Sequence, residues 1–195
     1  AIIDQVNALF SGADTNTVIT GTLTDSGGTI LTAAGSKEIS TGSNDAITVH
    51  IGTNIDPDAG NLAQLKKLVD QAGVTRLNGS MTISAADIAT LKTDFDTSTK
   101  IGKNYIDFTL DNAVTAEQAS DLVDLTNGTI TFGAAGINDT VGKLANATGT
   151  AISADLSNAL GSGGDNTVDI TVTNGGSALS TSAHVKALNV IHAAQ

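Results

Sequence analysis

The sequence predicts an α/β fold in which short strands alternate with short helices in a degenerate βα repeat, stacked like a solenoid on a mainly parallel sheet. Three observations favour this class. Runs of β-branched residues alternate with segments of helical periodicity. One helix-start pattern recurs along the chain, and its copies are separated by roughly the length of one βα unit. An α+β fold is the alternative.

The recurring pattern is an aliphatic residue, then Ser or Thr, then an Ala-containing polar run with Leu on the inner face. Its four copies begin at Ile83, Val114, Ile152 and Leu179. Ser84 with Asp87, and Thr115 with Gln118, have the spacing of a capping box, which satisfies the first N–H groups of a helix. We therefore expect four short helices of about three turns each.

Segments rich in β-branched and aromatic residues lie around these helices and predict strands. The predicted strands are residues 46–51, 79–83, 105–110, 128–132 and 167–172. The residues that precede the helix caps are spaced by 31, 38 and 27 positions. One helix between successive strands leaves room for a crossover, so the spacing predicts parallel pairing.

A short acidic segment, NIDPDAGN, contains the best candidate metal ligands, Asn54, Asp56 and Asp58. Acidic exported proteins often bind calcium through such loops. An EF-hand loop that began at Asp56 would need an acidic residue where Lys67 stands. The pattern favours a turn into a helix over residues 61–72, and a calcium site is the alternative. Weaker candidates of the same kind are Asp14, Asp94, Asp96 and Asp165.

The two ends of the chain resemble each other. Residues 7–32 and 158–180 both read as a helix end, a Ser-Gly loop with an Asp, a Thr-rich strand and a Gly-Gly turn. We interpret the chain as a single repetitive domain over residues 1–195. Its parts are a partial N-terminal repeat (1–45), central βα units (46–150) and a C-terminal repeat (151–195) that matches the N-terminal one.

Neither terminal repeat has an obviously polar outer unit. Repeat stacks need polar terminal units to stay soluble, because an internal unit ends in an apolar face. An uncapped stack can continue into another subunit, and a head-to-tail contact that does not close builds a filament or lattice. The sequence therefore predicts self-association through residues 1–32 and 158–195.

Composition excludes several classes of partner. Nine basic against twenty acidic residues give a net charge of -11, which disfavours nucleic acid and anionic membranes. The sequence lacks the long apolar run of a membrane span, so we expect no membrane insertion. Aromatic residues are only 3% of the chain, which disfavours sugar binding by stacking. Cys is absent, so disulfides and thiolate chemistry are excluded.

No motif predicts an enzyme. The His residues are His50, His184 and His192, and the last two are two helical turns apart, too far to share a metal. The sequence has no G-x-S-x-G elbow. The Gly-rich stretch 161–166 has no P-loop lysine and precedes a strand, so we interpret it as a connection.

The capped helices, the NGTITF-like strand and the segment GINDTVGKLANA (136–147) resemble repeat modules of very large secreted bacterial surface proteins. Those proteins are surface-layer, adhesin-like or appendage components. The resemblance covers most of residues 77–195 and, more weakly, residues 1–45. It implies a bacterial protein, located outside the cell or on its surface, with no catalytic residues.

Two functions follow as expectations. The first is a non-catalytic structural protein that self-associates into a filament, tube or surface lattice. The alternative is an adhesin or virion surface module, excised from a longer repetitive protein, that binds glycan or protein.

Overall fold

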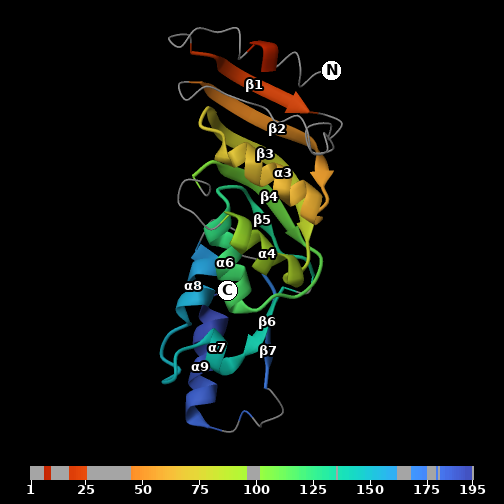
Figure 1. Ribbon diagram of the computed structural model, residues 1–195. Helices are drawn as coiled ribbons and strands as arrows, with labels where there is room; N and C mark the ends of the chain where they lie inside the picture. Colours follow the sequence, from red (N-terminus) through yellow and green to blue (C-terminus); the bar gives the residue numbers. More distant parts are fainter. Residues whose placement is uncertain are drawn as a thin grey trace.

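The computed structural model describes residues 7–9, 18–25, 45–95, 102–134, 136–161, 168–174, 179 and 181–194. Its elements follow one another along an elongated stack, with β1 at one end and α9 at the other (Figure 1). In chain order they are β1 (Thr20–Asp25), β2 (Ala46–Ile55), α3 (Ala59–Asp70), β3 (Val74–Ile83), α4 (Ala85–Phe95), β4 (Asn104–Leu110), α6 (Ala116–Leu125), β5 (Ile130–Thr131), β6 (Ile137–Thr140), α7 (Val141–Leu144), α8 (Ala154–Gly161), β7 (Ile170–Thr173) and α9 (Ser182–Ala193).

The main sheet has the strand order β1-β2-β3-β4-β5, and all of its pairs are parallel. Each strand lies beside the next strand along the chain. Helices α3, α4 and α6 lie in the connections that follow β2, β3 and β4, as parallel pairing requires. The predicted α/β class and the parallel arrangement are therefore confirmed.

The second sheet, β6-β7, continues the same stack. Phe108 of β4 faces Ile130 of β5, and beyond the end of β4 Val114 forms a parallel bridge to Ile137 of β6. Strand β5 thus pairs with β4, and β6 contacts the segment that continues β4, with a short interruption between β5 and β6. Gly136 lies there with a φ of 54°, and a Cβ at this position would overlap the Asp169 carbonyl oxygen.

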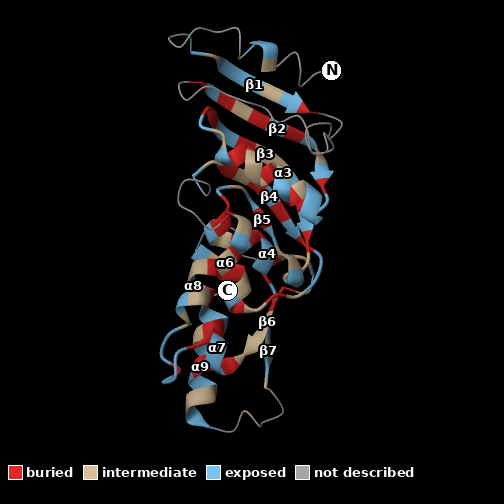
Figure 2. Ribbon diagram, viewed as in Figure 1, coloured by how far each residue is buried: buried red, intermediate tan, exposed pale blue. Residues whose placement is uncertain are grey.

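Burial alternates along the interior strands because successive side chains of a strand point to opposite faces. In β4 the inward residues Ile106, Phe108 and Leu110 are buried, whereas Asp107 and Thr109 are exposed. The helices cover the inward face, and the buried residues lie between the helices and the sheet (Figure 2). The core is almost entirely aliphatic, as the composition predicts.

The predicted helix caps are present. Thr115 and Gln118 form a complete capping box at the start of α6. Ser84 donates both its N–H and its hydroxyl to Asp87 Oδ2, at 2.8 and 2.7 Å, which supplies the acidic half of a box. The aliphatic residues before these caps are buried, so each helix begins where its strand leaves the core.

Several boundaries differ from the sequence prediction: β2 extends to Ile55, β5 covers only Ile130–Thr131, and β7 begins at Ile170. β3 begins at Val74 rather than at residue 79, because parallel neighbours on both sides sustain the strand through Asn78 and Gly79. The cap of α9 is Thr181, one residue later than the repeat pattern places it. β6 and α7 were not predicted, since elements of four residues show no measurable periodicity.

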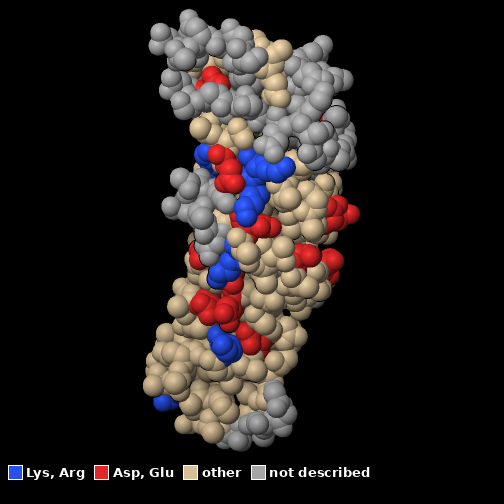
Figure 3. Space-filling model, viewed as in Figure 1, with Lys and Arg blue, Asp and Glu red and all other residues tan. Residues whose placement is uncertain are grey.

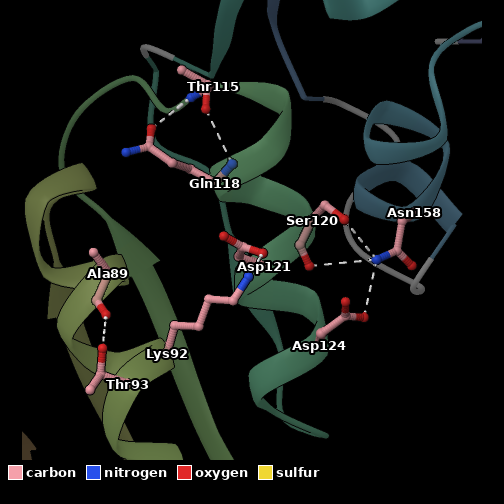
Figure 4. A network of polar contacts seen from close by, with 9 residues as sticks. All are labelled: Ala89, Lys92, Thr93, Thr115, Gln118, Ser120, Asp121, Asp124 and Asn158. Atoms are coloured by element: carbon pink, nitrogen blue, oxygen red, sulfur yellow. Dashed lines mark hydrogen bonds and ion pairs between the residues drawn. The ribbon is translucent and has the colours of Figure 1, made fainter. Parts of the chain in front are cut away.

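Polar side chains connect α3, α4, α6 and α8 in turn, and Figure 4 shows the contacts that join α4, α6 and α8. The bridges are Lys66 to Asp94 between α3 and α4, Lys92 to Asp121 between α4 and α6, and Asn158 to Ser120 and Asp124 between α8 and α6. The two ion pairs join residues 28 and 29 positions apart, which is one repeat. Acidic and basic side chains are accordingly interspersed along this face (Figure 3).

Candidate functional site

Of the predicted calcium ligands, Asp58 serves as the N-cap of α3. Its Oδ1 accepts the N–H of Asn61 at 2.8 Å, and its Oδ2 accepts the Asn61 side-chain amide at 3.0 Å. The same amide donates to the backbone carbonyl of Asp56. The predicted turn into a helix is therefore confirmed, with α3 beginning at Ala59.

The three candidate ligands are not joined by a common contact. Asn54 is exposed on β2, where it faces Ser80 of the next strand, and the Asp56 side chain is exposed as well. Within the described ranges, no three His, Cys, Asp or Glu residues are grouped closely enough to hold a metal ion. The calcium site stays a prediction.

The remaining candidates are dispersed. Asp94 pairs with Lys66 at 3.4 Å, whereas Asp14, Asp96 and Asp165 lie outside the described residues. His50 is exposed on β2, and His192 is exposed on α9. None of the helices in the described part of the chain is long and apolar enough to cross a bilayer.

The outward face of the sheet is the first candidate surface. Parallel sheets are usually covered on both faces. Here the outward residues of β2, β3 and β4 are polar and exposed or half-buried, and the parallel register aligns them in rows across the strands. The rows are His50, Asn78 and Tyr105; Asn54, Ser80 and Asp107; and Thr82, Thr109 and Thr131.

A hollow of about 400 Å³ lies on this face. A volume of this size is at the lower end of the range for small-molecule sites. The side chains that line it include His50, Arg76, Tyr105, Asp107 and Asn127. They come from three neighbouring strands and from the turn after α6.

Arg76 and Tyr105 both line this hollow and contact each other. The guanidinium carbon of Arg76 lies 3.8 Å from the centroid of the Tyr105 ring. Arg76 Nε donates to Asn78 Oδ1 at 2.7 Å. A stacked ring and a hydrogen bond hold the plane of the guanidinium, so its remaining N–H groups have a fixed direction.

The part of the lining that follows α6 is held in place by a buried asparagine outside the hollow. Asn104 is 1% exposed, and its amide donates to the Leu125 carbonyl at 2.8 Å, which ties the end of α6 to β4. The turn that follows packs against β4 so closely that a Cβ on Gly128 would overlap the Ile106 carbonyl. Asp107 Oδ1 then accepts the Thr129 N–H at 2.7 Å, so this carboxylate is held in place.

The two ends of the stack are the second candidate surface. Among the described residues, the large hydrophobic side chains that stay exposed are Leu9, Val18 and Val185, with exposed fractions of 61%, 56% and 56%. All three lie in the segments 1–32 and 158–195 that the sequence predicts as subunit contacts. A second hollow, of about 160 Å³, lies at the N-terminal end and is mainly apolar. It is lined by Leu9, Ile19, Leu23 and their neighbours.

The sequence prediction missed the hollow on the outward face. The sequence feature that could have indicated the hollow is that the chain contains one Arg and one Tyr, and these two residues are in contact. Recognition of their proximity required the start of β3 at Val74, because only then does the parallel register bring Arg76 beside β4.

Comparisons with known proteins give no relative. No family model, no curated protein and no solved structure matches this chain. The resemblance to secreted bacterial surface proteins therefore stays a prediction.

Proposed function

We infer that this protein is a non-catalytic, extracellular structural subunit that self-associates end to end into a filament, tube or lattice. The observation that carries the proposal is the position of Leu9, Val18 and Val185. Single exposed apolar residues are common on any surface. In the described part of this chain, however, the large ones occur only in the two terminal segments.

The terminal strands support the same interpretation. The inward apolar residues of β1 and β7 are only partly buried, whereas those of the interior strands are buried. A unit of a repeat stack completes its core through the next unit. When the C-terminal end of one copy docks on the N-terminal end of another, both ends gain such a neighbour. Two different surfaces then meet, so growth continues unless the rotation between copies closes a ring.

The test is the mass of the protein as a function of concentration, by sedimentation velocity and electron microscopy, with and without millimolar calcium. We expect Val185→Lys and Val18→Lys each to weaken association by about tenfold or more, because buried apolar contacts dominate such interfaces. The matched control is Thr90→Lys, which adds the same charge at an exposed position of α4 and leaves both ends intact.

Salt gives a second readout. Copies with a net charge of -11 repel one another, so added salt should strengthen association through apolar ends. Monomers at every concentration and salt level would contradict the proposal, and so would an equal effect of Thr90→Lys and Val185→Lys.

The second candidate is a surface binding module of a longer protein. The hollow around Arg76 and Tyr105 favours it, since polar side chains converge there on an otherwise open sheet face. A protein that stays monomeric and binds a ligand at this hollow would be a binding module, whereas one that polymerises and binds no ligand would be a structural subunit alone.

A further inference from the structure

The only Arg and the only Tyr of the chain lie together on the outward sheet face. The chain has 20 acidic residues, yet Arg76 forms no ion pair within the described ranges. Lys66 and Lys92, by comparison, both contact a carboxylate. Arg76 is thus an oriented cation that contacts no carboxylate among the described residues, although Asp107 lines the same hollow.

The orientation of Arg76 favours one kind of anion. Nε is engaged by Asn78 Oδ1, and the ring of Tyr105 covers one face of the guanidinium. The two terminal nitrogens carry the remaining N–H groups in a planar fork. Such a fork matches the two oxygens of a carboxylate, and the pair of parallel charge-assisted bonds is stronger than a neutral contact.

The rest of the hollow favours hydroxyl groups. Asp107 and the amides of Asn78 and Asn127 line it, together with Thr129 and His50. Carboxylate and amide oxygens accept hydrogen bonds from hydroxyls, and amide nitrogens donate to them. The Asp107 carboxylate would repel a second anionic group, so the lining fits a ligand with one negative charge and several hydroxyls.

We propose that this hollow binds an acidic saccharide residue with a single carboxylate, a uronic acid unit. Its carboxylate would bind the Arg76 fork, and its hydroxyls would bind Asp107 and the neighbouring amides. Arg76 covers a face of Tyr105, so recognition depends on hydrogen bonds rather than on ring stacking, which agrees with the low aromatic content. The net charge of -11 disfavours sulfated polyanions.

The inference rests on the binding-module candidate and is independent of end-to-end assembly. The hollow lies on β2, β3, β4 and the turn after α6, away from the exposed Leu9 and Val185. Failure of the ligand to bind would leave self-association unaffected. Failure to polymerise would leave the ligand site intact.

Tyrosine fluorescence of the full chain tests the proposal, because Tyr105 is the only Tyr and Trp is absent. The probes are methyl glucuronide and methyl glucoside, which differ only in the carboxylate, and acetate as a carboxylate without a sugar. We expect methyl glucuronide to bind with a Kd of about 1 mM. The glucoside and acetate should bind at least about tenfold more weakly, since each lacks half of the contacts.

Arg76→Gln should weaken glucuronide binding by about tenfold or more, because the charge-assisted fork is lost. Lys143→Gln is the matched control, since it removes one positive charge from a side chain that is 64% exposed and lies outside the hollow. Amide shifts of Asn127, Gly128 and Thr129 in NMR spectra should respond to the same ligand. Equal affinity for glucuronide and glucoside, or for glucuronide and acetate, would overturn the proposal. So would the absence of any response in both fluorescence and amide shifts.

Discussion

In the interior of the stack, the inward residues of β2, β3 and β4 are at most 4% exposed, whereas the inward apolar residues of the terminal strands β1 and β7 are only partly buried (Figure 2). Both regions place aliphatic residues on the inward face and mostly polar residues on the outward face. The difference is the number of neighbours, because an interior strand packs between two others. How deeply an inward side chain is buried therefore depends on the position of its strand in the stack rather than on the local sequence.

The largest expected effect comes from the same substitution in the two regions. Leu77 is 0% exposed on β3, so Leu77→Ala should lower the free energy of unfolding by about 4 kcal/mol through the lost burial and the cavity left behind. Leu23 on β1 is only partly buried, and Leu23→Ala should cost about 1 kcal/mol. Urea unfolding of both variants measures the difference. Equal losses would break the distinction between interior and terminal units.

The second largest loss of stability should come from the removal of a polar contact in the interior. Asn104→Ala removes the amide that binds the Leu125 carbonyl and the oxygen that accepts the Ile106 N–H, so two buried groups lose a partner. We expect a loss of about 3 kcal/mol. Asn54→Ala, at an exposed position of β2, should change stability by less than about 0.5 kcal/mol. A loss for Asn104→Ala no greater than that of Asn54→Ala would show that the tie between α6 and β4 does not stabilise the interior.

The sequence predicted most elements correctly because their signals are local. The capping box of Thr115 and Gln118 and the alternation of residues 105–110 each span a few residues, and both are present in the structure. β3 was predicted too short because Asn78-Gly79 is typical of a turn. Parallel pairing with β2 and β4 overrides that local preference.

The candidate site could not be predicted because it depends on pairing between strands that are distant in sequence. Arg76 and Asn78 belong to the part of β3 that local signals missed, and their proximity to Tyr105 depends on strand register. Register is set by packing across strands that are about one repeat apart in sequence. The strands of the two terminal segments could be predicted, because the similarity of residues 7–32 to residues 158–180 is visible in the sequence itself. The structure confirms the strands within both segments, β1 and β7.

The smallest expected effects concern the caps of one interior and one terminal helix. Asp58→Ala should cost about 1 kcal/mol, since it leaves the Asn61 N–H at the start of α3 without its partner. Thr181→Ala removes the equivalent bond to the His184 N–H in α9. A terminal unit of a stack can open by itself, so this variant should mainly raise local hydrogen exchange in α9 and leave the main transition almost unchanged.

Asp58→Asn separates the cap from the alternative role of this residue in calcium binding. Asn caps a helix about as well as Asp, so the cap alone predicts a change within a few tenths of a kcal/mol. If the carboxylate also held calcium, millimolar calcium would raise the Tm of the unsubstituted protein and would have a smaller effect on Asp58→Asn, because binding to the folded state is stabilising. Thermal unfolding with calcium and with a chelator measures both. If Asp58 acts only as the cap of α3, the Tm difference between the unsubstituted protein and Asp58→Asn will be the same with calcium and with the chelator.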